Sequence, residues 1–534
     1  MWDNTLNYVN TWKKHSLVGL VGFSIEKYES DGLKASGSGF PDDQVLTNLN
    51  SAAKKNSISS SYSSNTLASF LSRLEYKFNN RYLLTLNFRA DGSSQFGPDK
   101  RWGYFPSGAV AWIITEENFM KDYSNIVSYL KLRGSVGKTG SQNLGAYDWR
   151  TLMGSATYNG AAGIVPSSLG NDILQWEEQI QKEVGLDYGF WDDRIRGTLG
   201  YYQKKVDNLL YSDPVPTSSS FSSVYQNIGS LKNRGIEFDV RVDIIKNVQK
   251  DLTWNVDFNI ARNRTTLEKL NSSDGYFGGG AYDYFKIEEG GETGRFYGYK
   301  DAGRLFMTNE ELVGLKTIDP KTGTLKYYRD DYNYERQGDV YIMDLDGDGQ
   351  ITADGDRTVI GNANPDFFGG FGSTLYWKGL MLNAVFSYSV GGDRFWDEEK
   401  NSSGDMNVYN TSNRILDSWT VNPGVNASYP RAMYYGWGSN SIITDRYIHD
   451  ASYLRMTALN LSYRLPKHLY KNSILNAVEF TFQATNLFTW TKYPGMDPQG
   501  NFSTTYSAFY NMGIDYSTYP SARTYNFGIK LTLK

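Results

Sequence analysis

The chain lacks cysteine altogether and has only 3 histidines among its 534 residues. Without thiols it can form no disulfide, thiolate metal site or cysteine nucleophile. The histidines, His15, His449 and His468, are far apart, and neither a His-Glu-x-x-His zinc motif nor a Gly-x-Ser-x-Gly nucleophile elbow occurs. The sequence therefore predicts a protein that is not an enzyme and requires no cofactor.

The chain also has no large excess of charge of either sign and no long apolar run. Lys and Arg number 54 against 58 Asp and Glu, a net charge of −4, so the chain has no basic excess to attract nucleic acid. No run approaches the roughly 18 apolar residues of a transmembrane helix, and the segment after Met1 lacks the basic and apolar regions of a signal peptide. A membrane protein with this sequence must cross as a β-barrel, because helices and closed barrels are the structures that satisfy every backbone group in lipid.

Aromatic residues and glycine are abundant, with 41 Tyr, 27 Phe, 13 Trp and 53 Gly. Aromatic side chains favour strands and glycines favour turns. Segments such as 236–244 and 254–260 place an apolar residue at every second position, which gives a strand one apolar and one polar face. The composition and the alternation together predict an all-β protein.

About fifteen strands are expected from this alternation. They lie near residues 3–12, 16–26, 66–78, 81–91, 105–114, 128–138, 181–191, 194–210, 230–245, 251–264, 365–376, 380–390, 447–465, 477–488 and 523–533.

The connections between these strands tend to alternate in length. Short links at Lys13-Lys14, Asn79-Asn80, Asp192-Asp193 and Lys378-Gly379 alternate with long polar ones at 139–180, 265–364, 391–446 and 490–521. Outer-membrane barrels have this asymmetry, with short periplasmic turns and long extracellular loops. The pattern predicts an antiparallel transmembrane β-barrel. Alternation alone also fits a soluble sandwich, so a secreted carbohydrate-binding or adhesive β-protein and a β-rich glycan hydrolase are the alternatives.

The direction of the strands carries a further expectation. If the long loops lie outside the cell, both the first and the last strand run toward the periplasm. Bacterial single-chain barrels have an even number of strands. A count of about fifteen starting on an inward strand therefore predicts a part of a larger barrel.

Several segments in a shared order resemble the SusC/RagA class of TonB-dependent outer-membrane receptors. They are residues 81–84, 91–97 (Asp-Gly-Ser-Ser-Gln-Phe-Gly), 101–107, 130–140, 227–237, 359–366, 486–488 and 493–495. The resemblance implies a barrel of about 22 strands with a plugged lumen. It makes residues 1–534 the carboxyl-terminal part of that barrel, with about 15 of the strands, a long external loop at 265–364 and the plug domain absent.

The resemblance also implies a location and partners. It places the protein in the bacterial outer membrane, in contact with lipid, where it would import a glycan or peptide together with a SusD-like surface lipoprotein. Energy would come from the TonB complex, through an amino-terminal region that this chain lacks.

An acidic segment within the 265–364 loop resembles a calcium-binding loop. Carboxylates at positions one, three and five converge on a hard cation, a glycine permits the turn, and position seven offers its backbone carbonyl. Position twelve, which should hold the closing acid, is Gly355, and we expect the neighbouring Asp356 to take that part. The predicted calcium ligands are Asp344, Asp346, Asp348, Gln350 and Asp356. An acidic turn without metal is the alternative.

Three aromatic residues form a second candidate site. Tyr434, Tyr435 and Trp437 fall in a glycine-containing external loop, where their rings can stack on sugars. Loop aromatics also pack on neighbouring loops, which is the alternative for these three.

Overall fold

A computed structural model gives the fold of the chain. It describes residues 1–42, 44–270, 276–278, 284–314, 317–318, 325–326, 328–329, 335–403, 411–424, 426–433, 440, 442–471, 474–500, 512–516 and 518–534.

Across these ranges, no helix combines the length and the apolar character needed to cross a membrane.

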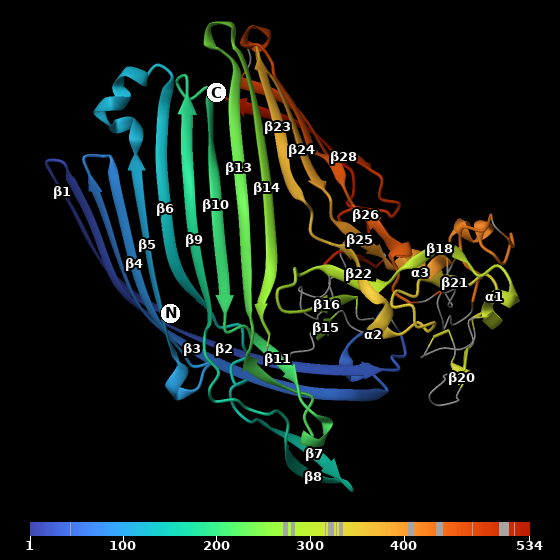
Figure 1. The fold of residues 1–534 in the computed structure, drawn as a ribbon. Helices are drawn as coiled ribbons and strands as arrows, with labels where there is room; N and C mark the ends of the chain where they lie inside the picture. The colour runs from blue at the N-terminus through green and yellow to red at the C-terminus, as the bar shows by residue number, and fades with distance from the viewer. Residues whose placement is uncertain are drawn as a thin grey trace. The chain divides into compact units, whose positions relative to one another are not determined.

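The dominant element is a sheet of 15 strands with neighbouring strands antiparallel (Figure 1). Its order follows the sequence and skips the strands that lie within loops: β1 (Trp2–Trp12), β2 (His15–Ser38), β3 (Lys54–Phe78), β4 (Tyr82–Ser93), β5 (Trp102–Ile113), β6 (Val127–Ser141), β9 (Glu177–Phe190), β10 (Ile195–Asp207), β13 (Ser230–Asn247), β14 (Leu252–Lys269), β23 (Phe367–Trp377), β24 (Leu380–Val390), β27 (Tyr453–Arg464), β28 (Leu475–Thr491) and β30 (Thr524–Leu533). Each strand corresponds to one expected from the alternation, so the all-β antiparallel fold is confirmed.

The short links are tight turns whose central residues have positive φ. Asn79 and Asn80 have φ values of 52° and 57°, and Lys378 and Gly379 have 49° and 85°. Two-residue hairpins of type I′ need positive φ at both central positions, which Asn, Asp and Gly adopt at least cost. These turns therefore fix the register of the strands that they join.

The chain divides into two compact units, which are described separately. The first comprises Met1–Asp187 and Tyr201–Lys232. Its strands β2 and β3 have 24 and 25 residues, far beyond the expected 16–26 and 66–78. The extension is rich in Ser and Lys, so it lacks the apolar alternation that reveals a half-buried strand. The smaller elements of this unit are η1 (Leu49–Ser51), η2 (Pro98–Lys100), η3 (Ile114–Glu116), η4 (Asn118–Tyr123), the hairpin β7 (Met153–Tyr158) and β8 (Ala161–Pro166), β11 (Leu210–Pro214), η5 (Thr217–Ser219) and β12 (Ser223–Asn227).

The second unit comprises Tyr188–Gly200 and Asn233–Lys534. Its long connections contain β15 (Tyr276–Gly278), β16 (Phe285–Ile287), β17 (Arg295–Tyr299), β18 (Asp301–Leu305), α1 (Asn309–Gly314), β19 (Thr317–Ile318), β20 (Leu325–Lys326), β21 (Val340–Ile342), α2 (Ala353–Asp356), β22 (Arg357–Asn362), β25 (Asp393–Trp396), α3 (Asp397–Ser403), β26 (Ile448–Asp450) and β29 (Ile514–Asp515), with the 3-10 turns η8 (Asn413–Asp417) and η9 (Asp445–Tyr447). Its shorter links contain the 3-10 turns η6 (Val248–Lys250) and η10 (Lys467–Tyr470). The strand expected over 447–465 is divided, because β26 pairs with β25 in a loop sheet while β27 joins the main sheet.

Candidate functional site

The sheet of the first unit exposes an entire apolar face. Leu86, Val110, Leu132, Val136 and Val184 lie on four strands, β4, β5, β6 and β9, and their exposed fractions range from 43% to 59%. Registers such as Leu84 with Val110 and Leu86 with Gly108 place these residues on one side of the sheet. A contiguous apolar surface of this extent marks contact with lipid or with another protein.

The opposite face of the same strands is polar and carries ion pairs. Arg133 on β6 lies 3.1 Å from Asp187 on β9 and also pairs with Glu183. Lys131 reaches Asp187 at 3.0 Å. Apolar residues on one face and paired charges on the other are the arrangement expected of a wall between lipid and an aqueous lumen.

A buried cluster in the first unit explains the motif at residues 91–97. Phe96 is fully buried and packs against Trp176, with ring centroids 5.1 Å apart. The indole N–H of Trp176 donates to the carbonyl of Arg101 at 2.9 Å. A Cβ on Gly97 would lie 2.3 Å from the carbonyl oxygen of Asp172, so this close approach requires glycine. The motif thus anchors the long 142–176 connection to the ends of β4 and β5.

In the second unit, hydrophobic cores hold the long connections together. One joins residues distant in sequence: Tyr284, Phe285, Phe296, Ala363, Phe395, Ile443, Tyr447 and Ile514. The other comprises Leu305, Phe306, Tyr328, Val340, Ile342 and Ile351. The connections therefore form packed structure in which buried side chains hold distant segments together.

Buried charges accompany these cores. Asp339, 2% exposed, lies 2.6 Å from Nε of Arg431 and accepts a hydrogen bond from the side-chain amide of Asn440 at 2.8 Å. Burial raises the pKa of Asp339, while the donors from Arg431 and Asn440 oppose that rise. Its contacts with Arg431 and Asn440 hold together two connections that are far apart in the sequence.

Sequence reasoning missed a second polar cluster, centred on Glu399 in α3. This carboxylate is 5% exposed, lies 2.5 Å from Nε2 of His449 and accepts hydrogen bonds from Arg414 at 2.7 Å and Tyr429 at 3.1 Å. The guanidinium of Arg414 lies over the ring of Trp396, 4.5 Å from its centroid. No signal in the sequence joins these residues, because they are spread along one long connection between β24 and β27, up to 50 residues from Glu399, and meet only through tertiary packing.

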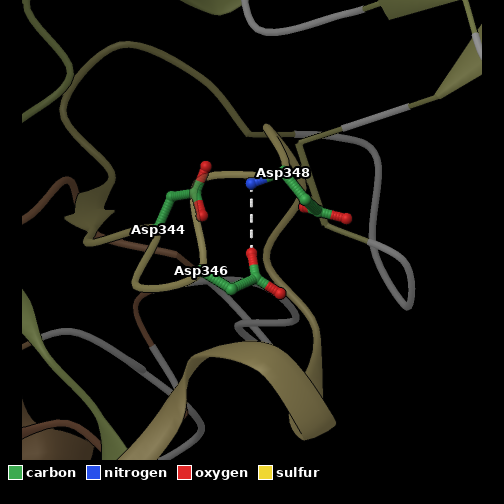
Figure 2. Close-up of side chains that lie close together, drawn as sticks. All are labelled: Asp344, Asp346 and Asp348. Carbon is green, nitrogen blue, oxygen red and sulfur yellow. Dashed lines mark hydrogen bonds between the residues drawn. The ribbon is translucent and has the colours of Figure 1, made fainter.

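The predicted calcium loop lies between β21 and α2, and Figure 2 shows its three aspartates on one turn. Asp344, Asp346 and Asp348 are solvent-accessible, and each offers a carboxylate oxygen within 4.8 Å of those of the others. Gly347 and Gly349 have φ values of 76° and 81°, which let the backbone turn around the carboxylates.

Backbone hydrogen bonds order this loop from within. The carboxylate of Asp344 accepts from the N–H groups of Gly347 and Gly349 at 2.7 and 2.8 Å. Asp346 accepts from the N–H of Asp348 at 3.1 Å, and Asp348 accepts from that of Gln350 at 2.8 Å. The chemistry of the set, three carboxylates with oxygen atoms turned to one place, fits a hard divalent cation.

Asp356 is placed apart from the three clustered aspartates. It is fully buried, and its two oxygens accept from the N–H groups of Leu345 at 2.6 Å and Thr352 at 2.7 Å. It therefore closes the loop through the backbone. Ile342 and Ile351, both buried in the second core, fix the two ends of the loop.

The three aromatics predicted to bind sugar, Tyr434, Tyr435 and Trp437, lie outside the described residues.

The two-faced sheet, its tight turns and its packed long connections define the class of protein: the wall of an outer-membrane β-barrel. Residues 2–431 match the family described as TonB dependent receptor-like, beta-barrel. The chain belongs to this family, whose members are transport receptors of the outer membrane and not enzymes.

Individual relatives narrow the resemblance to the SusC/RagA class. The chain is 32% identical to TonB-dependent receptor P3 of Formosa agariphila over 99% of its own length and 52% of that protein. It is 32% identical to TonB-dependent receptor SusC of Bacteroides thetaiotaomicron over 88% of this chain and 44% of SusC. The solved structure of the RagAB peptide transporter superposes with a TM-score of 0.78 and 27% identity, covering 99% of this chain and 55% of that one. The resemblance predicted from the sequence is confirmed.

The chain spans about half the length of the curated relatives that it matches, between 50% and 53% for three Formosa agariphila receptors.

Proposed function

We propose that the protein of which this chain forms the barrel wall imports glycan or peptide fragments across the outer membrane, with energy from the TonB complex. The observation that carries the proposal is the agreement of nearly the whole chain with the RagAB peptide transporter, in fold and at 27% identity. The polar face of the sheet supplies the lumen wall, and the packed connections shape the vestibule where the ligand first binds.

We further propose a surface lipoprotein of the SusD type as partner. The proposal is supported by the similarity to SusC and to RagA as it stands in the RagAB complex. The partner would cover the vestibule formed by the long connections. Their buried cores are suited to this role, because a rigid rim limits the ordering entropy lost when two proteins associate.

A transport assay tests both proposals. In the bacterium that carries the gene, deletion should abolish uptake of either labelled oligosaccharides or labelled peptides, and the unmutated gene should restore it. Uptake should also cease when TonB is removed, and affinity purification of the receptor should recover a surface lipoprotein. Uptake of both ligand classes at the unmutated rate in the deletion strain would contradict an import role. Recovery without any lipoprotein would contradict the partner.

We also propose that Asp344, Asp346 and Asp348 bind Ca²⁺ and thereby stiffen the loop between β21 and α2. Three convergent carboxylates and the left-handed glycines support this proposal. Calcium should slow proteolysis of the 335–364 region, and the double change Asp346→Ala with Asp348→Ala should remove that protection.

Asp354→Ala is the matched control for the calcium test, since this neighbouring acid is outside the clustered set. Protection that is insensitive to chelation in the unmutated protein would exclude the site.

A further inference from the structure

The apolar face of the first unit contains a hollow of about 690 Å³. We call it the trough. Gly108 on β5 and Gly134 on β6 form its floor, and Leu86, Val136 and Val184 form its walls. A second hollow of about 600 Å³ shares Gly134 and Val184 with it and extends the groove across the same strands. The volume falls within the range of small-molecule sites, about 300–1,000 Å³.

The two glycines have no local reason to be glycine. A Cβ on Gly108 would lie 3.4 Å from the Leu86 side chain, and one on Gly134 would lie 3.8 Å from the Glu183 carbonyl oxygen, both ordinary contacts. Neither residue has a positive φ. Glycine in a strand interior weakens the strand, so the presence of glycine at these two positions requires another explanation.

Their register explains what the missing side chains create. Gly108 pairs with Val136, and Val110 pairs with Gly134, so the two glycines lie diagonally across neighbouring strands. Large residues surround them on the same face. The absent side chains therefore open a continuous channel in the apolar surface.

A single lysine lies at the rim of the trough. Lys182 on β9 is exposed, and no carboxylate of the described chain pairs with it. Lys138, another lysine beside β9, is in contrast paired with Glu178 at 2.6 Å. On this face of β9 the residues from Val184 to Phe190 are apolar, whereas Glu178 and Lys182, with Ile180 between them, precede that run; Lys182 is the charged residue next to it.

We propose that the trough seats an acyl chain of a membrane lipid whose anionic phosphate headgroup pairs with Lys182. The apolar walls exclude a polar occupant, and the flexible lysine side chain can reach to the headgroup level while its methylenes stay on the apolar surface.

Native mass spectrometry of the whole receptor, purified from outer membranes in mild detergent, tests this assignment. The protein is titrated with phosphatidylglycerol, which is anionic, and with phosphatidylcholine, which is zwitterionic. Binding should favour phosphatidylglycerol by about fivefold, the factor that corresponds to the ~1 kcal/mol that one lysine contributes near anionic lipid. Lys182→Gln should abolish this preference and leave binding of phosphatidylcholine unchanged.

Filling the trough tests the acyl-chain seat. The double change Gly108→Leu with Gly134→Leu should reduce the retention of both lipids. Val136→Phe, which narrows the trough from its wall, provides the same test if the double variant fails to assemble.

Two matched controls isolate the site. Gly163→Leu changes a strand glycine in the β7–β8 hairpin, away from the trough, where a Cβ meets only the Ala156 carbonyl oxygen at 3.6 Å, and Lys27→Gln removes a lysine that is paired with Glu29 at 2.7 Å. Neither should change the retention or the preference.

Several results would overturn the proposal. They are equal binding of the two lipids by the unmutated protein, a preference that survives Lys182→Gln, and retention unaffected by the filled trough. Conversion of a receptor dimer to a monomer by the filling changes, with lipid retention unaltered, would assign the trough to a second copy of the chain and also overturn it. The import function is independent of each of these outcomes.

Discussion

Replacing Phe258 by Arg should separate a membrane wall from a soluble sheet. Phe258 lies in β14 opposite Phe371 of β23, and its ring stacks on Tyr388 with centroids 6.1 Å apart. The neighbouring Asp257 points to the other face of the strand, because side chains alternate. The two positions therefore test the two faces at nearly the same depth.

The depth of Phe258 follows from strand geometry. It lies six residues beyond Leu252, the first residue of β14, which follows a short connection. At ~3.4 Å per residue and a tilt of about 40°, this places Phe258 roughly 15 Å above the end of the strand. The apolar band of an outer-membrane barrel is ~25 Å tall, so its midplane is about 12 Å above its edge. Phe258→Arg should thus cost about 2–4 kcal/mol, the value for arginine near the midplane.

The measurement is reversible urea unfolding of the receptor in lipid vesicles, followed by the change in gel mobility between folded and unfolded barrel. Asp257→Asn, on the lumen side, should alter the free energy of unfolding by no more than about 0.5 kcal/mol. Phe258→Leu, which keeps the position apolar, should cost only the lost ring stacking, about 0.5–1.5 kcal/mol. Equal costs for Phe258→Arg and Asp257→Asn, or a cost below about 1 kcal/mol for the arginine, would refute a lipid-facing β14.

Three further predictions concern the connections. Asp497 lies 2.6 Å from Arg455, and both side chains are buried. Burial by itself raises the pKa of Asp497. The hydrogen bonds that Arg455 and the backbone N–H of Gln499 donate to it outweigh burial and hold the pKa of Asp497 below its ordinary value. The free energy that this pair contributes to folding is therefore fully present above the ordinary pKa of aspartate, and it is lost as the pH falls through the lowered pKa of Asp497. Protease protection of the 490–500 segment should accordingly decrease on acidification below about pH 4. Asp497→Ala, which leaves Arg455 buried and unpaired, should cost about 3–5 kcal/mol at neutral pH in a thermal unfolding assay, and an unchanged transition would contradict the pairing. Phe96→Ala should cost about 3–5 kcal/mol by opening a cavity beside Trp176, seen as faster proteolysis of the 142–176 connection, while equal rates in both proteins would show that Phe96 does not anchor it.

The strands of the main sheet could be predicted because apolar and polar residues alternate along most of them. Phe480 and Phe482 in β28 show this directly, and the predicted ends of that strand lie within a few residues of Leu475 and Thr491. The long polar extensions of β2 and β3 were not predicted. Their side chains are exposed on both faces, so backbone pairing holds them together and no apolar pattern records it.

The candidate sites divide in the same way. The cluster of Asp344, Asp346 and Asp348 was predicted, because all its members come from one turn and their spacing sets their geometry. The buried position of Asp356 was not, since it depends on which backbone N–H groups the folded loop presents. The contact between Glu399 and His449 was not predicted either, because the two residues are 50 positions apart and only tertiary packing brings them together.

The sequence by itself determined the class of this protein: an all-β, outer-membrane receptor wall with short turns on one side and long connections on the other. Those features are local, because alternation, turn residues and loop lengths act within a few residues of one another. Tertiary structure alone decided what the connections do. Residues such as Phe296, Phe395 and Ile514 carry no local mark of their contact, and only the folded chain brings them into one core. It also decided the trough, since two glycines and a lysine on three strands become one surface only through the register of the sheet.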